Sequence, residues 1–193
     1  MADLADTYSF GEVRSTHRQN LVLADVNSSD LYALWQKLTA LQLATPNIGT
    51  ATDMICCPGL DFCSLANAGS IGVAKDINTA LEDMDYVHDI GDVKINMSGC
   101  MNGCAHQSVG HIGILGVDKK GEEWYQLTLG GSSENEAALG ERLGPAVDKQ
   151  QIVGVITTIL AVYVQQRVED ESFLQTVQRI GLEPFKERVY ASH

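Results

Sequence analysis

Two pairs of cysteines, each in a loop that contains glycine or proline, constrain this chain more than any other feature. Cys57 and Cys63 form a C-x5-C pair, and Cys100 and Cys104 form a C-x3-C pair. The glycines supply the tight turns that ligand loops need, and they let backbone N–H groups approach bound sulfide. Four thiolates on two such loops can hold a [4Fe–4S] cluster. We therefore predict that these four cysteines bind one iron–sulfur cluster.

The cysteine spacing leaves other uses of the thiols open. Structural zinc favours tighter C-x2–4-C pairs, so the C-x5-C spacing disfavours zinc without excluding it. The chain has no C-x-x-C redox motif, which weakens a thioredoxin-like interpretation. Buried cysteines without a ligand are a third alternative. Cys56 could replace its neighbour Cys57 as a ligand. We favour Cys57, because the Cys-Pro-Gly turn then begins at the ligand and Cys56 becomes a small buried hydrophobic residue.

Composition and charge narrow the class of protein. The 193 residues are 45% hydrophobic, which is enough for one domain, or a domain and a subdomain, with its own core. A net charge of −12 argues against binding to nucleic acid or to an anionic membrane. Residues 1–6 lack the features of a secretory signal, and the most apolar run, 152–164, is too short to cross a bilayer. We expect a cytoplasmic protein, where cysteines bind metal more often than they form disulfides.

Hydrophobic periodicity and turn residues predict a mixture of helices and strands. Residues 12–26 are expected to form a strand or a bent strand pair, followed by a helix over 31–41. Further helices are predicted at 64–84, 136–143, 149–167 and 172–180. Further strands are predicted at 92–96, 109–117 and 124–129, the last two joined by a hairpin turn at 118–121. Because these elements follow one another without a regular βαβ rhythm, we predict an α+β fold.

Several segments resemble the siroheme-dependent sulfite and nitrite reductases. C-M-N-G-C at 100–104 looks like that family's second cluster motif, usually C-P-N-G-C, with methionine in place of proline. Residues 57–66 resemble the family's first cluster motif. Residues 14–21 are similar to its R-x-T-x-x-Q-N-L strand, and L-T-L-G-G at 127–131 resembles its L-x-L-G-G segment. Residues 173–189 resemble its C-terminal tail, so the similarity extends over nearly the whole chain.

The resemblance implies different roles for the four cysteines. Cys57, Cys63 and Cys100 would be plain ligands of a [4Fe–4S] cluster, and Cys104 would also bridge to the iron of siroheme. Electrons would come from ferredoxin or a flavoprotein reductase. The substrate would be sulfite or nitrite, reduced by six electrons to sulfide or ammonia.

The resemblance also implies polar contacts to siroheme. Arg18, Gln19 and Asn20 would hydrogen-bond its carboxylates, with ordinary polar residues at a sheet edge as the alternative. Asn102 would face the haem or brace its loop. Structural roles are expected for the two histidines that flank the second cysteine pair, His106 and His111.

Domain organisation follows from the same comparison of motifs. We expect residues 1–48 to form a partial ferredoxin-like, siroheme-contacting unit and residues 49–193 to form a 4Fe–4S and siroheme-binding domain with a mixed sheet. Family members are longer chains with two pseudo-repeated halves, so an N-terminal half that carries the anion-binding basic residues is expected as a partner. The predicted function is the C-terminal portion of an assimilatory sulfite reductase. The alternatives are a nitrite reductase of the same family and a non-catalytic iron–sulfur electron-transfer module or inactive fragment.

Overall fold

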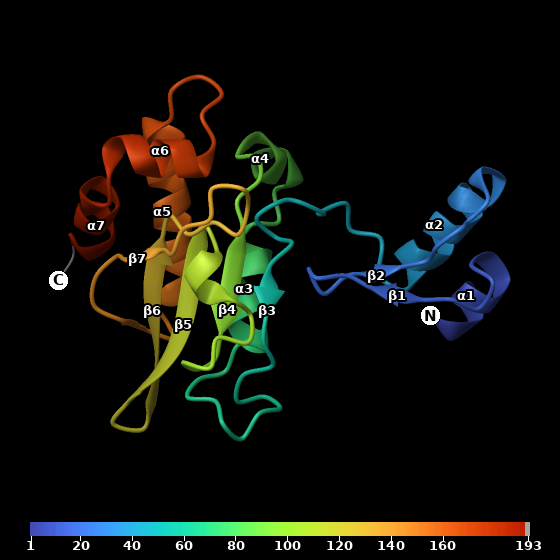
Figure 1. Cartoon of the computed structure of the whole chain (residues 1–193), viewed down its shortest axis with the longest axis horizontal. Helices are drawn as coiled ribbons and strands as arrows, with labels where there is room; N and C mark the ends of the chain where they lie inside the picture. Colours follow the sequence, from blue (N-terminus) through green and yellow to red (C-terminus); the bar gives the residue numbers. More distant parts are fainter. Residues whose placement is uncertain (192–193) are drawn as a thin grey trace. The chain divides into compact units, whose positions relative to one another are not determined.

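The chain consists of two compact units, residues 1–47 and residues 48–193. The computed structural model in Figure 1 describes residues 1–191. Within that range no helix combines the length and the apolar character needed to span a membrane.

The first unit is built from two helices and a small hairpin. Helix α1 (Ala2–Tyr8) precedes the antiparallel strands β1 (Arg14–Ser15) and β2 (Leu21–Val22), and a 3-10 turn, η1 (Ser28–Asp30), leads into α2 (Leu31–Ala40). The strand pair and the helix that follows it confirm the sequence prediction. The short helix α1 was not predicted, because it offers only seven residues and no side-chain cap.

The second unit contains a mixed six-stranded sheet. Its main order is β3-β4-β5-β6-β7, and β8 pairs with β6. β3, β4 and β5 are parallel neighbours, whereas β6 runs antiparallel to β5, β7 and β8. This topology confirms the predicted α+β class and mixed sheet. The strands are β3 (Ile55–Cys56), β4 (Ile95–Ser98), β5 (Ile112–Lys119), β6 (Glu122–Leu129), β7 (Glu141–Arg142) and β8 (Val147–Asp148).

The core lies between the sheet and two helices. Helices α3 (Ile71–Ala80) and α5 (Ile152–Gln166) lie behind the strands in Figure 1. The buried side chains of β4, β5 and β6 join those of these helices in one hydrophobic cluster. Successive residues of a strand point to opposite faces, so alternate positions on each strand reach this cluster. α5 and the β5–β6 hairpin confirm the predicted elements, with ends shifted by a few residues.

Two predicted helices differ from the structure. The helix predicted for 64–84 is shorter: α3 begins only at Ile71, and a separate helix α4 (Met84–Asp89) follows it. The helix predicted for 136–143 is wrong, because that segment joins the sheet instead. It contains strand β7, Gly140 N–H donates to Ser108 O at 2.8 Å, and Leu143 N–H donates to Leu127 O at 3.0 Å. Hydrogen bonds to distant parts of the chain override the local helical pattern.

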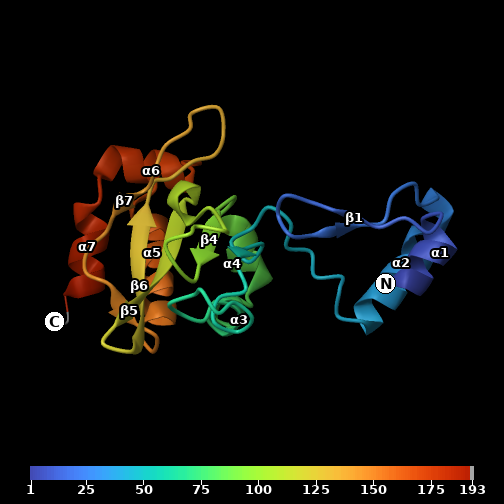
Figure 2. The same cartoon turned by 60° about the horizontal axis from the view of Figure 1, so that its bottom comes forward.

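Helices α6 (Phe173–Ile180) and α7 (Glu183–Tyr190) complete the unit, away from β4, as the second view shows (Figure 2). α6 matches the predicted helix, and Ser172 caps it in a reciprocal capping box with Gln175. The sequence prediction did not include α7, which begins with proline at its first turn.

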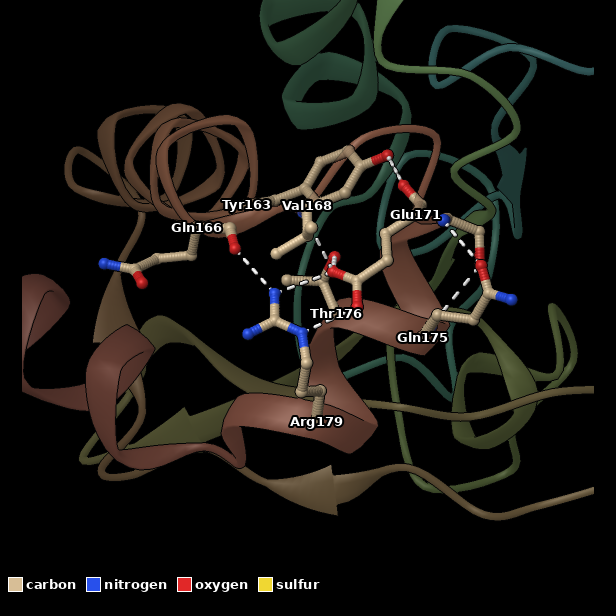
Figure 3. Close-up of polar contacts among 8 residues, drawn as sticks. Tyr163, Gln166, Val168, Glu171, Gln175, Thr176 and Arg179 are labelled. Carbon is tan, nitrogen blue, oxygen red and sulfur yellow. Dashed lines mark hydrogen bonds and ion pairs between the residues drawn. The ribbon is translucent and has the colours of Figure 1, made fainter.

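An ion pair locks the turn between α5 and α6 (Figure 3). The Arg179 guanidinium binds both carboxylate oxygens of Glu171, at 2.6 and 2.7 Å, and also reaches Gln166 O at 2.6 Å. Thr176 Oγ1 and Val168 N–H donate to the same carboxylate. These contacts, led by the Arg179 hydrogen bond, lower the pKa of Glu171 to about 2. A carboxylate that the sequence presents as part of an acidic run is thus a structural anchor.

This anchor predicts a pH-dependent stability. Because the folded pKa of Glu171 lies below its ordinary value of 4.5, its contribution is complete above pH 4.5 and is lost as pH falls toward 2. We expect wild type to be more stable than Glu171→Gln near neutrality, and the difference to shrink over that acidic window. Urea unfolding at a series of pH values measures the free energy of unfolding of both proteins. Asp170→Asn, which removes a carboxylate outside the network, is the control. A difference between wild type and Glu171→Gln that stays constant down to pH 2 would contradict the assignment.

Close packing of glycines joins the chain after β3 to the chain after β4. A methyl group added at Gly99 would lie 2.6 Å from Ala68 O and 2.8 Å from Gly59 Cα. Real side chains do not come so close, so no other residue fits at this position without a backbone shift.

Gly99→Ala is therefore expected to destabilise the protein by about 1–3 kcal/mol through overpacking. Gly72→Ala is the matched control, because a methyl group there meets nothing within 4 Å. On helix α3 that substitution should stabilise by about 0.4–1 kcal/mol. Urea unfolding followed by circular dichroism compares the two. A Gly99→Ala protein as stable as wild type would show that the contact is not tight.

Candidate metal centre

Both cysteine pairs begin where neighbouring parallel strands end. β3 ends at Cys56, directly before Cys57, and β4 ends at Ser98, two residues before Cys100. β3 and β4 pair in parallel with Cys56 opposite Met97, and Cys57 N–H donates to Met97 O at 3.0 Å. The carboxyl ends of adjacent parallel strands meet at one edge of a sheet, where ligands bind in many α/β proteins. The strand pairing therefore brings the starts of the two cysteine loops together.

The backbone of Gly99 connects the two loops directly. Its N–H donates to Cys57 Sγ at 3.0 Å, and its carbonyl accepts from Asn67 and Ala68 N–H at 2.8 and 3.0 Å. Ser70 Oγ lies 3.7 Å from the same sulfur. Hydrogen bonds to cysteine sulfur are one of the features by which proteins tune iron–sulfur clusters.

The first loop is held at its far end as well. Asp61 Oδ2 accepts two backbone N–H groups at the start of α3, at 3.3 and 3.2 Å. Gly69 N–H donates to Glu123 Oε2 at 2.5 Å, and Tyr125 donates its hydroxyl to Gly69 O at 2.9 Å. The Lys149 ammonium and the Gly69 N–H hold the pKa of Glu123 below its usual range. Burial raises the pKa of Tyr125, so its hydroxyl stays a donor. The loop thus has little freedom before any ligand binds.

The five cysteines differ in exposure. None of the five forms a disulfide within residues 1–191: Cys57 and Cys100 are buried, Cys56 and Cys63 are half-buried and Cys104 is exposed. Cys56 Sγ donates to Cys57 O at 3.2 Å. Burial raises the pKa of Cys56 to about 12, with the neighbouring Cys57 adding to the effect. Cys56 is therefore a neutral thiol near neutral pH, whereas metal binding uses the thiolate.

The second loop is a tight turn. Gly103 N–H donates to Cys100 O at 3.2 Å, and His106 N–H donates to Gly103 O at 2.7 Å. Gly103 and His106 both have left-handed backbone, with φ of 66° and 52°. Asn102 is exposed at the tip of this turn, between two predicted ligands.

The two histidines differ in environment. His106 is exposed at the end of the second loop and precedes the 3-10 turn η2 (Gln107–Val109). His111 is buried, its Nδ1 accepts Lys94 N–H at 3.2 Å, and its ring stacks on Phe173 with centroids 6.4 Å apart. These contacts support a structural role for His111.

Three candidate siroheme contacts lie in the first unit. Arg18, Gln19 and Asn20 occupy the turn of the β1–β2 hairpin, not a strand. Thr16 Oγ1 accepts from Arg18 and Asn20 N–H at 3.3 and 3.0 Å, and Gln19 has a positive φ of 61°. Gln19 is exposed, and the other two are half-buried.

The four candidate donors are thiols, the ligands that iron–sulfur clusters use. Among residues 1–191, His, Cys, Asp and Glu side chains form no group of three or more that could hold a metal ion. The four candidate thiols nevertheless belong to two loops that start from adjacent strands, and a backbone N–H already points at one sulfur. Soft thiolate ligands with such donors are the usual environment of an iron–sulfur cluster.

The residues that hold the second loop are not among the predicted site residues. Asn96 and Ser98 of β4 are buried polar residues, and both bind the chain just after Cys104. A signal existed, because polar residues alternate with Ile95 and Met97 in a strand that leads into the loop.

Comparison with known proteins identifies relatives of the whole chain. Residues 49–193 match the family model of the nitrite and sulphite reductase 4Fe-4S domain, and residues 1–41 match that of the nitrite/sulfite reductase ferredoxin-like half domain. The chain is 28% identical over 94% of its length to the assimilatory ferredoxin-dependent nitrite reductase of Haloferax mediterranei, of which it covers 32%. It is 30% identical over 93% of its length to sulfite reductase [ferredoxin] 2 of Mycolicibacterium paratuberculosis, of which it covers 34%.

A solved structure shares the fold. The Mycobacterium tuberculosis NirA protein matches 95% of this chain with a TM-score of 0.79 and 27% identity, and the match covers 35% of the NirA chain. The chain therefore spans about a third of the length of the relatives that it matches. With one family model covering residues 49–193, the chain belongs to the nitrite and sulphite reductase 4Fe-4S domain family.

Proposed function

We propose that this chain is the C-terminal, cluster-binding portion of an assimilatory sulfite reductase. Cys57, Cys63, Cys100 and Cys104 hold a [4Fe–4S] cluster, and Cys104 also bridges to siroheme. One observation carries the proposal: Cys57 and Cys100 follow adjacent parallel strands, and Gly99 N–H between them donates to Cys57 Sγ at 3.0 Å. The parallel strands thus supply a rigid frame for the ligands on the two loops.

When bound, the coupled cluster and siroheme supply the multi-electron reduction that no side chain can perform. The chain's own residues have three tasks. Gly99 N–H donates to the Cys57 sulfur, the left-handed turn at Gly103 leads into the exposed Cys104, and Cys56 stays a neutral thiol outside the ligand set. Arg18, Gln19 and Asn20 at the tip of the first unit's hairpin are donors for the siroheme carboxylates.

The complete reaction needs more protein than this chain supplies. The chain corresponds to about a third of its relatives' length, so a family N-terminal half, on the same polypeptide or another, completes the substrate site. Its electron donor is ferredoxin or a flavoprotein reductase, and its compartment is the cytoplasm. The acidic surface, with a net charge of −12, is unsuited to nucleic acid or anionic membranes as partners.

Nitrite is the second candidate substrate. The Haloferax relative is named as a nitrite reductase and the Mycolicibacterium relative as a sulfite reductase, at similar identity. Steady-state reduction of each anion by the protein assembled with its N-terminal half, with a reduced viologen dye as donor, compares the two. A higher kcat/KM for sulfite supports the first proposal, and a higher value for nitrite replaces it with the second.

The ligand set predicts which cysteines matter. After anaerobic reconstitution with iron and sulfide, single serine variants at Cys57, Cys63, Cys100 or Cys104 should lose most of the bound iron. Cys56→Ser is the matched control and should retain a wild-type iron content, because its thiol is protonated and turned toward Cys57 O. Iron and sulfide analysis with the visible absorption spectrum measures the result. Loss of the cluster in Cys56→Ser with retention in Cys57→Ser would reverse the assignment.

The bridging role of Cys104 separates the proposal from a simple electron-transfer module. With siroheme supplied, wild type should show a siroheme Soret band together with coupled cluster signals in the electron paramagnetic resonance spectrum. Cys104→Ser should lose that coupling. A cluster-only spectrum in wild type would reject siroheme binding by this chain alone, and persistent coupling in Cys104→Ser would reject the bridge.

A further inference from the structure

Strand β4 carries two polar side chains in an otherwise apolar environment. All four of its residues, Ile95–Ser98, are buried. Ile95 and Met97 belong to the hydrophobic core, so Asn96 and Ser98 face the opposite side of the sheet, where they are 6% and 1% exposed. Buried polar groups of this kind are costly unless they are hydrogen-bonded, so their partners show what they do.

Both side chains bind the same short stretch of chain. Asn96 Nδ2 donates to Ala105 O at 3.0 Å and to His106 O at 3.2 Å, and Ser98 Oγ accepts Ala105 N–H at 3.1 Å. Ala105 itself is fully buried. Ala105 is the residue directly after Cys104, so β4 binds the chain immediately beyond that cysteine.

These hydrogen bonds, together with the covalent chain, fix both ends of the second loop on strand β4. Cys100 is attached covalently through Gly99, and Ala105 is attached through Asn96 and Ser98. Cys104 lies between these fixed points and is exposed. The direction of an exposed thiol is thus set by groups on a rigid element, the arrangement that precise ligand placement requires.

Neighbouring glycines leave room for the hydrogen bonds between β4 and the chain after Cys104. A methyl group at Gly110 would lie 2.9 Å from Asn96 Cβ, and a methyl group at Gly113 would clash with Gln107 O and Thr128 Oγ1. η2, which follows the loop, can therefore lie directly against β4 and β5.

We propose that Asn96 and Ser98 are positioning residues that hold Cys104 in register with Cys100. They act through the backbone of Ala105 and His106, which their side chains bind. The effect of these two residues on a bound cluster rests on the proposed function, whereas their hydrogen bonds to the loop do not.

The first experiment uses the metal-free chain, kept reduced, and hydrogen–deuterium exchange of the peptide that spans 100–107. Ser98→Ala removes only the acceptor of Ala105 N–H and is expected to speed exchange about fivefold, and Asn96→Ala, which removes two bonds, about tenfold or more. Ser132→Ala is the matched control, because Ser132 is also buried and accepts a loop N–H, that of Glu134 at 3.2 Å, from outside the 100–107 peptide. Should Asn96→Ala not fold by circular dichroism, the milder Ser98→Ala decides.

The second experiment reads the position of the ligand itself. After reconstitution with iron and sulfide, Ser98→Ala is expected to shift the midpoint potential and broaden the electron paramagnetic resonance signal of the reduced cluster. Ser132→Ala, which loses a comparable bond elsewhere, should give the wild-type values. A residue that merely stabilised the fold would change unfolding without changing these two quantities.

The outcomes separate this proposal from the proposed function. Faster exchange with an altered cluster signal supports positioning of Cys104. Exchange equal to that of Ser132→Ala overturns the proposal, and so does a loosened loop with wild-type potential and signal. If wild type takes up no cluster, the proposed function fails, and the exchange result alone decides whether Asn96 and Ser98 hold the loop.

Discussion

The parallel pairing of β3 with β4 is the interaction on which the candidate site depends. It places Cys57 directly beyond one strand and Cys100 just beyond the other, and the peptide of Gly99 joins the two loops through both its N–H and its carbonyl. Asp61, which binds the N–H groups at the start of α3, and Tyr125, which binds Gly69, hold a loop whose origin this pairing sets. The sheet, more than the loops themselves, therefore sets where the candidate ligands lie.

Much of the fold followed from local patterns. The alternation in β5 and β6 and the turn through Lys120 and Gly121, both at positive φ, predicted the hairpin. The apolar periodicity of α5 likewise predicted its helix. These elements are long or carry specific turn residues, so local and tertiary preferences agree.

The failures share a physical cause. Residues 64–70 were predicted as the start of a helix, yet Asn67 and Ala68 donate their N–H groups to the carbonyl of Gly99, far away in the sequence. Residues 136–143 are drawn into the sheet beside β6. The cysteines stood out as candidate ligands because they are rare and paired. Asn96 and Ser98 did not stand out, because the role of a polar residue in a strand can be assigned only when its hydrogen-bond partners are known.

The parallel strands also have a consequence for the order of events in the cell. β3 and β4 are joined by a crossover that contains α3 and α4, so their pairing must close a long stretch of chain. Such non-local contacts form late and slowly in folding, because the entropy of closure is lost before the contacts form. Cys57 and Cys100 are therefore distant in the nascent chain and become neighbours only once the sheet exists. A ligand that needs both cysteine loops can therefore bind only once this part of the sheet has paired.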